Sequence, residues 1–333
     1  MVTLPRATPG HSETQTFQAP HAMADVEVQH SMFFNPLWTA DTTRTAGARL
    51  RSARVTTLHW ILRLAVAAEF IGHGAFGIRT KAAWLPYFGV AGISAAWAWT
   101  LMPIIGVVDI ALGVLALLRP MRAVLLYMAF WGLLTACLRP LAGEGIWECL
   151  ERAGNFGVPG AFLVLAGWGR SHTDWVSRLE TPAGTPARVA TLGWLLRLTT
   201  GTLLIGHGGI GAVMAKDWTP YFAALGIGAA TVEARALIPL VGWFEMALGL
   251  LVIARPSAAL PVFVCIWKVG TEWLRPMAGE PLWEFIERGG SYAAPLVLLV
   301  LCPWPIYFTK VVASDEALQR IAPNRFQGPQ ACC

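Results

Sequence analysis

The sequence predicts an all-α integral membrane protein whose eight transmembrane helices form two parallel four-helix repeats. The first observation is composition: 55% of the 333 residues are hydrophobic and 14% are charged, whereas a water-soluble chain carries roughly a quarter charged residues. The second is a series of apolar stretches of about 20 residues, the length that crosses a bilayer. The third is an internal repeat. Together they exclude a soluble enzyme, a disordered chain and a secreted disulfide scaffold.

A polar segment precedes the apolar ones. Residues 1–56 are rich in Pro, Thr and His and lack a long apolar run, which predicts a disordered N-terminal tail. The first repeat is predicted over 57–170, the second over 192–312, with a linker over 171–191 and a C-terminal tail over 313–333. The apolar stretches predict transmembrane helices near residues 57–77, 91–118, 121–138, 156–170, 192–213, 225–254, 258–274 and 292–312.

The second half of the apolar region repeats the first. Residues 60–93 match residues 194–227 at 15 of 34 positions, and residues 103–165 match residues 239–301 at 26 of 63 positions. This identity indicates duplication and fusion of one four-helix unit. Because each unit has an even number of spans, both halves enter the membrane from the same side, which makes the repeats parallel.

Basic residues predict the orientation in the membrane. Lys and Arg beside the predicted helices number 13 on the side of the two termini and seven on the opposite side, and basic residues favour the cytoplasmic side. We therefore expect both termini and the linker to be cytoplasmic, in a membrane such as the bacterial inner membrane. The formal net charge of +5 is too small an excess to indicate nucleic-acid binding.

Two histidines are shared by the halves, and shared residues mark what one unit needs twice. His73 and His207 each lie between two glycines in an apolar stretch. A neutral imidazole can ligate a metal or haem, hydrogen-bond a quinone carbonyl or relay protons. The alternative is structural: the glycines let another helix approach, and the imidazole bonds a backbone carbonyl. Haem is disfavoured, because each unit offers one His at one depth.

Two acids stand at equivalent positions of the second predicted helix of each unit, Asp109 and Glu245. An intramembrane carboxylate is costly, so it normally faces the bundle interior and has a partner. One interpretation is a structural pair with Arg63 or Arg197, although we expect these arginines to reach the cytoplasmic headgroups. The other is proton handling by a carboxyl with a raised pKa. The two acids and the two histidines are our candidate catalytic residues.

Three further charged residues of the apolar stretches have no charged counterpart in the other half. They are Glu69, Lys268 and Glu272, which align with Leu203, Gly132 and Ala136. These differences are expected to specialise one half.

The densest shared group follows the third predicted helix of each unit. There we expect Pro to end that helix, Gly-Glu to begin a short interfacial helix, and Glu148 and Glu284 to pair with the arginines four positions later. One interpretation is a well-capped re-entrant connector, and the other is the rim of an outward-facing binding pocket. The candidate substrate-binding residues are Arg139, Glu144, Trp147, Glu148, Arg275, Glu280, Trp283 and Glu284.

The six cysteines predict no metal site and no disulfide framework. They include no C-x-x-C pair and no zinc spacing, and none aligns with a cysteine of the other half. Thiol chemistry is therefore not expected to be the shared activity.

Short motifs in both halves carry a family resemblance. Residues 62–74 and 196–208 each run from Leu-Arg-Leu to Gly-His-Gly, and residues 245–255 run from a Glu through Gly-Leu-Leu to an Arg. These motifs resemble the first and second helices of the DoxX-like family of four-helix membrane proteins. The resemblance implies association with membrane redox complexes, such as those that contain small subunits of a thiosulfate:quinone oxidoreductase. It thereby implies quinone as the candidate cofactor and redox subunits as partners within the lipid bilayer.

Residues and resemblance together predict a redox-associated membrane protein that binds a quinone or a small oxidisable substrate at its outward face. His73 and His207 would form hydrogen bonds or relay protons, with Asp109 and Glu245 as their proton partners. The alternative is a non-enzymatic transporter, lipid-binding protein or membrane-complex assembly protein in which the same residues form a polar bundle core. A third interpretation is structural pairing with a membrane subunit or a second copy of the chain.

Overall fold

Helices make up all the regular structure that is described. The computed structural model describes residues 44–302 except 182–183, 229–231 and 256, and the regular elements within these ranges are all helical. Five helices contain segments long and apolar enough to cross a membrane: α2 (Arg44–Ile78), α4 (Ala95–Leu118), α5 (Arg122–Leu141), α9 (Pro186–Ala212) and α11 (Val232–Ala254). The protein is therefore a helical integral membrane protein, all-helical in its described part, which confirms the predicted class.

The remaining elements are shorter or more polar. α7 has 14 residues and ends at Ala166 instead of near residue 170, because the following Gly167 turns the chain with a φ of 74°. α12 carries a buried lysine and a buried glutamate among its apolar residues. These elements are η1 (Ala82–Trp84), α3 (Leu85–Val90), α6 (Ile146–Glu151), α7 (Ala153–Ala166), α8 (His172–Val176), α10 (Thr219–Ala224), α12 (Ala259–Met277), α13 (Leu282–Glu287) and α14 (Gly289–Leu301).

Helix α9 begins six residues before the predicted start at residue 192, within the predicted linker. The hydroxyl of Thr185 accepts a hydrogen bond from the backbone N–H of Arg188, and Pro186 occupies the first turn. Both features favour a helix start at this point.

Helix α2 begins at Arg44, inside the segment predicted to be a disordered tail. The rest of that tail, residues 1–43, lies outside the described residues, as does the chain from residue 303 onward with the end of the last predicted span and the predicted C-terminal tail. Several of the basic residues that predict the orientation lie there too.

Proline does not end the third predicted helix of either half. Helices α5 and α12 each continue one residue past their proline, Pro140 and Pro276. The chain turns instead at Gly143 and Gly279, whose φ values of 93° and 90° favour glycine. The short helices that follow begin at Ile146 and Leu282, after the Gly-Glu pairs rather than at them.

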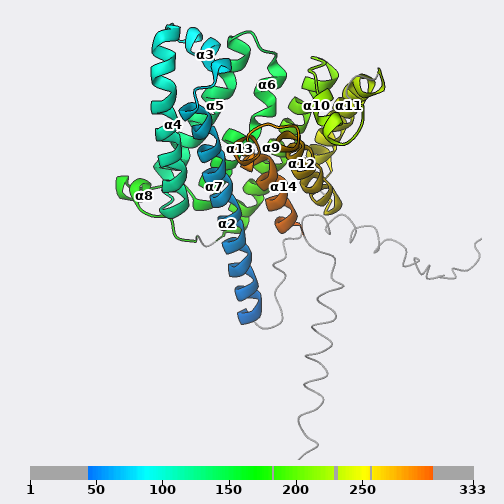
Figure 1. Ribbon diagram of the computed structural model, residues 1–333. Coiled ribbons are helices and arrows are strands. Elements are labelled where there is room, and N and C mark those ends of the chain that lie inside the picture. The colour runs from blue at the N-terminus through cyan, green and yellow to red at the C-terminus, as the bar shows by residue number, and fades with distance from the viewer. Residues whose placement is uncertain (1–43, 182–183, 229–231, 256, 303–333) are drawn as a thin grey trace, which may run out of the picture. The chain divides into compact units, whose positions relative to one another are not determined.

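Two long helix pairs flank the centre of the bundle. α2 packs along α4 and α9 packs along α11 (Figure 1). Glycines allow close contact: Gly74 faces Gly106 in the first pair and Gly208 faces Gly242 in the second, where a Cβ atom would overlap backbone atoms of the opposite helix.

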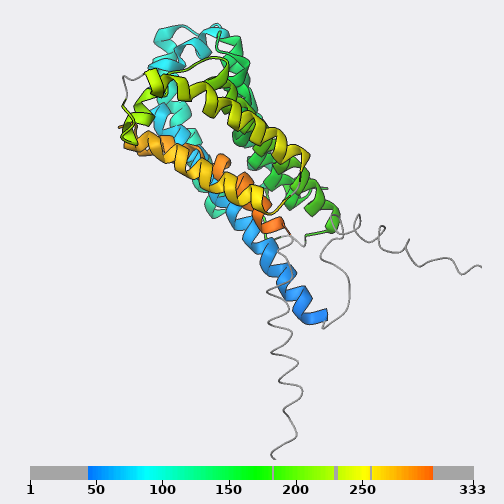
Figure 2. The same cartoon turned by 90° about the vertical axis from the view of Figure 1, so that its right-hand side faces the viewer.

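The core lies where α2, α7, α9 and α14 contact one another (Figures 1 and 2). Leu62, Phe162, Leu196 and Val297, one from each helix, are fully buried there. The short helices cross between the halves, because α13 packs on α2 and α6 packs on α9. Each connector therefore contacts the first helix of the opposite half.

Candidate functional site

Each shared histidine is hydrogen-bonded to the shared acid of its own half. His73 Nδ1 donates to Asp109 Oδ2 at 2.8 Å, and His207 Nδ1 donates to Glu245 Oε2. The two acids are 1% and 0% exposed. The structure therefore joins our four candidate catalytic residues as two imidazole–carboxylate pairs, and the predicted alternative of a histidine bonded to a backbone carbonyl is wrong.

The predicted pairing of these acids with arginine is also wrong. Arg63 donates to the carbonyl oxygens of Leu117 and Leu118 at 2.5 and 3.0 Å, at the C-terminal end of α4. Arg197 donates in the same way to Val252 and Ile253 near the end of α11. The last carbonyls of a helix have no partner within it, and a cation stabilises them. Both arginines thus cap a neighbouring helix.

A tryptophan stacks on each imidazole. The rings of His73 and Trp84 lie 4.6 Å apart at 22°, and those of His207 and Trp218 lie 4.8 Å apart at 18°. Because Nδ1 is held by a carboxylate and one ring face by an indole, Nε2 is the nitrogen of each imidazole that a ligand can reach.

The glycines beside the histidines allow the connector of the opposite half to approach. A Cβ atom on Gly72 would overlap the backbone of Glu287, and one on Gly206 would overlap the backbone of Leu150 and Glu151. The close approach expected of Gly-His-Gly is therefore confirmed. It brings a charged connector, and not only a helix of the same half, against each histidine.

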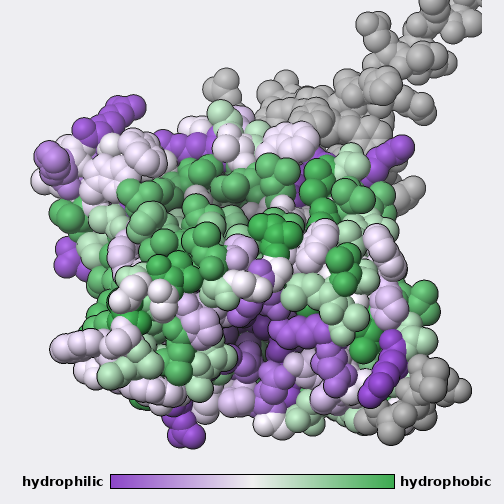
Figure 3. Space-filling view, turned by 90° about the horizontal axis from the view of Figure 1, so that it is seen from above, coloured by the Kyte–Doolittle hydropathy of each residue, from purple (hydrophilic) through white to green (hydrophobic). Residues whose placement is uncertain are grey.

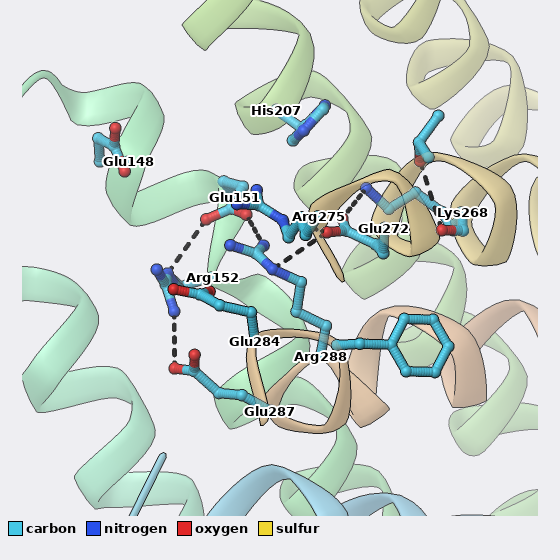
Figure 4. A network of polar contacts seen from close by, with 12 residues as sticks. Glu148, Glu151, Arg152, His207, Lys268, Glu272, Arg275, Glu284, Glu287 and Arg288 are labelled. Carbon is cyan, nitrogen blue, oxygen red and sulfur yellow. Dashed lines mark hydrogen bonds and ion pairs between the residues drawn. The ribbon is translucent and has the colours of Figure 1, made fainter. Parts of the chain in front are cut away.

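The connector arginines pair with glutamates of the opposite half (Figure 4), and Arg152 also pairs with the adjacent Glu151 at 3.1 Å. Arg152 Nη1 donates to Glu287 Oε1 at 3.0 Å, and Arg288 pairs with Glu151 in the reciprocal direction. Glu148, which we expected to pair with Arg152, instead accepts from Arg139 at 3.4 Å. Neither expected pair four positions apart forms, and Arg152 and Arg288 instead pair with a glutamate of the opposite connector.

Two lysines add a second set of pairs between the halves. Lys81 Nζ donates to Glu284 Oε1 at 3.1 Å, and Lys216 Nζ donates to Glu148 Oε1 at 2.7 Å. Glu284 therefore pairs with Lys81 instead of the expected arginine. Sequence reasoning missed both lysines, because the two positions are one residue out of register between the halves and so do not align with each other.

The contacts with arginine hold the carboxylates of Glu287 and Glu151 in the ionised form. Burial raises the pKa of Glu287, but the charges of Arg152 and His73 outweigh it and lower that pKa to about 2. Burial also raises the pKa of Glu151, but the charges of Arg288 and Arg152 outweigh it and hold that pKa well below its ordinary value.

The second half extends this network into α12. Glu272 Oε1 accepts from Lys268 at 2.6 Å, and Glu272 Oε2 pairs with Arg275 at 2.8 Å and with Arg288 at 3.0 Å (Figure 4). At the matching positions the first half has Ala136 and Gly132. The network is therefore unequal between the halves, as the unmatched charges predict.

A tyrosine joins each predicted arginine–glutamate pair. Tyr87 donates its hydroxyl proton to Glu144, which also accepts from Arg139 at 2.9 Å. Tyr221 likewise donates to Glu280, and Arg275 lies 3.3 Å from that carboxylate. Burial raises the pKa of both phenols above the ordinary value. The tyrosines belong to the repeated Trp-x-Pro-Tyr-Phe segment, so aligning the halves was the signal that could have found them.

Residues of both halves line a polar cavity of about 300 Å³. It contains His207 and both tyrosines, and Figure 3 shows a hollow bordered by hydrophilic side chains on the face seen from above Figure 1. Six of our eight candidate substrate-binding residues line the cavity: Arg139, Glu144, Glu148, Arg275, Glu280 and Glu284.

The two predicted tryptophans do not line this cavity. Trp147 packs on Gly209 of α9, and Trp283 packs on Phe76 with ring centroids 6.2 Å apart. The short helices α6 and α13 lie against α9 and α2, with their tryptophans in intramolecular contacts. That these helices are interfacial stays a prediction.

A second, apolar cavity of about 310 Å³ lies in the first half. His73 lines it together with Trp131 and apolar side chains of α3, α4 and α5. The two cavities adjoin, since four residues line both: Trp84, Tyr87, Arg139 and Arg152. The histidines thus differ in setting, with His73 on an apolar cavity and His207 on a polar one.

Among the described residues, no group of three or more His, Cys, Asp or Glu is arranged to hold a metal ion. Comparison with models of protein families, with curated proteins and with solved structures finds no match to this chain.

Proposed function

We propose that this protein is a redox-associated, DoxX-like membrane protein that binds a quinone in the apolar cavity and a small oxidisable substrate in the polar cavity. The observation that carries the proposal is the His73–Asp109 pair, whose imidazole lines an apolar cavity that adjoins a charged one. A ring with one polar edge fits a mostly apolar site whose few polar groups include such a histidine.

In this proposal the histidines exchange protons with bound molecules. A carboxylate on Nδ1 fixes the tautomer and stabilises the imidazolium that forms when Nε2 accepts a proton, as in other acid–base sites. Asp109 and Glu245 are the proton partners. Arg139, Arg275 and their glutamates bind the polar substrate, and a bound quinone would supply the electron acceptor.

The proposal includes two parallel four-helix repeats with eight spans. It is supported by the sequence identity of the halves and by their matched contacts: imidazole to acid, indole on imidazole, and arginine on the end of a neighbouring helix. In this arrangement the termini and the linker are cytoplasmic, and the cavities open outward. A topology reporter fused after Cys333 that reads out as extracytoplasmic would overturn the orientation.

A second candidate function is transport without a redox reaction. It is favoured by the position of the polar cavity, which is lined by both halves, since substrates of transporters with repeated halves bind between those halves.

The experiment that separates the two is organic extraction of detergent-purified protein with analysis for bound quinone. We expect quinone in the wild type and less in His73→Ala, and the His73→Ala/His207→Ala protein should lose cellular activity. His172→Ala, a change on the exposed helix α8, is the matched control. A quinone-free wild type, together with a double variant that keeps full activity, would refute the redox proposal.

A further inference from the structure

The two halves differ in how the shared acid meets a shared tryptophan. In the second half, Trp267 Nε1 donates to Glu245 Oε1 at 2.7 Å, while the other oxygen of Glu245 accepts from the histidine. The first half has Asp109 and Trp131 at the matching positions. There, Asp109 Oδ1 and Trp131 Nε1 are both buried and have no hydrogen-bond partner within the described part of the chain.

The difference follows from side-chain length. Aspartate is shorter than glutamate by one methylene group, about 1.5 Å of reach. Asp109 keeps its bond to His73, and its second oxygen makes no hydrogen bond to the indole, whereas the longer acid bonds both partners. A buried donor and a buried acceptor without partners are costly, and native structures normally supply a group for each.

The neighbouring space also differs between the halves. Trp131, Thr135 and Ala136 line the apolar cavity beside His73. The second half has Glu272 at the position of Ala136 and Lys268 at that of Gly132, and both charged side chains are 1% exposed and paired with each other. The second half thus places its own side chains where the first half has a cavity wall of small residues.

We propose that the first half alone binds one apolar molecule that bears a hydroxyl group. The hydroxyl accepts a hydrogen bond from Trp131 Nε1–H and donates one to Asp109 Oδ1. Trp131 lines the cavity but Asp109 does not, so the ligand reaches the carboxylate through a local movement of side chains. A hydroxyl can do both with one oxygen atom, whereas a carbonyl only accepts and an ammonium group only donates. The apolar body of the ligand contacts Phe88, Ile93, Leu101, Ile105 and Leu134, which line the cavity.

This inference rests on the proposed function in one respect, because both place an apolar ligand beside His73. Binding of the hydroxyl-bearing ligand requires no redox reaction. The inference and the proposed function can therefore fail separately.

The test uses the full chain in lipid nanodiscs and two tritiated probes, 4-pentylphenol and its methyl ether 4-pentylanisole, with empty nanodiscs to subtract partition into lipid. The ether keeps the apolar body and loses the proton that Asp109 accepts. We expect one phenol bound per chain, with an affinity about tenfold higher than that of the ether, the size of effect that one hydrogen bond gives. Equal affinities, as expected if only water occupies the polar atoms, would overturn the proposal.

Variants assign the preference to one half. Asp109→Glu should abolish it, because glutamate can reach the indole as Glu245 does, and Trp131→Phe should abolish it by removing the N–H donor. Trp267→Phe, the same change in the second half, is the matched control and should retain the preference. Loss of the preference in this control, or two phenols bound per chain, would overturn the assignment to the first half. The comparison of probes on the wild type needs no variant to fold.

The same preparations distinguish the two proposals. A protein that prefers the phenol but contains no quinone and keeps its activity without the two histidines would refute the proposed function and leave this inference standing. A protein that contains quinone but binds both probes equally would do the reverse.

Discussion

The lowered pKa of Glu287, the partner of Arg152, gives the stability that its negative charge contributes through all its neighbours. Glu287 is 3% exposed, and its pKa is lowered from the ordinary 4.5 to about 2, because Arg152 and His73 outweigh the effect of burial. A pKa difference of that size corresponds to about 3 kcal/mol of folding free energy. We therefore expect Glu287→Gln to lower the free energy of unfolding at pH 7 by about 3 kcal/mol, within the usual range for breaking a buried ion pair.

The pH dependence has a defined sign. Because the pKa of Glu287 is lower in the folded state, its contribution is complete above pH 4.5 and is lost as the pH falls through about 2. The assay is unfolding in mixed micelles by added SDS, followed by tryptophan fluorescence between pH 7 and pH 3. The wild type should lose stability below pH 4.5 more steeply than Glu287→Gln. Glu180→Gln, a change at an exposed position, is the control. A loss below about 1 kcal/mol at pH 7, or equal pH slopes for variant and wild type, would refute the reasoning.

Three further predictions use the same unfolding assay. Gly206→Ala places a Cβ atom against the backbone of Leu150 and Glu151 and should lower the free energy of unfolding by about 1–3 kcal/mol. Gly270→Ala, whose Cβ atom meets no atom within 4 Å, should leave it unchanged. Equal effects of the two variants would contradict the interhalf contact. Arg63→Gln removes two charged hydrogen bonds to the end of α4 and should cost about 2 kcal/mol; no change would contradict the capping role. Lys216→Met should cost less than about 1 kcal/mol despite its ion pair, since that side chain is 57% exposed; a larger cost would show that the pair is less accessible to water than described.

Hydropathy and internal alignment predicted the helical membrane class, and they selected the residues of both imidazole–carboxylate pairs. Hydropathy succeeds because a membrane requires long apolar helices whatever their packing. Alignment succeeds because an imidazole and an acid that bond within one unit occur in both copies. His73 and Asp109, 36 residues apart on adjacent helices, are such a case.

The contacts between the halves could not be predicted in this way. Aligning the halves shows that both contain the same connector, but not which helix that connector contacts. For Arg152, a glutamate four positions earlier and a glutamate 135 positions later are chemically equal partners, and only the packing of α13 on α2 selects the second. The capping role of Arg63 was missed for a related reason. Every residue has a backbone carbonyl, so the sequence does not show which carbonyls an arginine will bond.

The crossing of the connectors gives a physical reason for fusing two such units. The histidine helix of each half packs against the connector of the other, so one unit alone would lack Glu287 beside Gly72 or Glu151 beside Gly206. Two identical chains could supply these contacts as a symmetric dimer, but every position would then be the same in both copies. A fused chain can place Asp109 in one half and Glu245 in the other. It can also carry Lys268 and Glu272 in the second half at the positions where the first half has small residues of the cavity wall. The proposed fusion would thus preserve the reciprocal contacts, leave the first half free for its proposed ligand and let the second half hold the charged network.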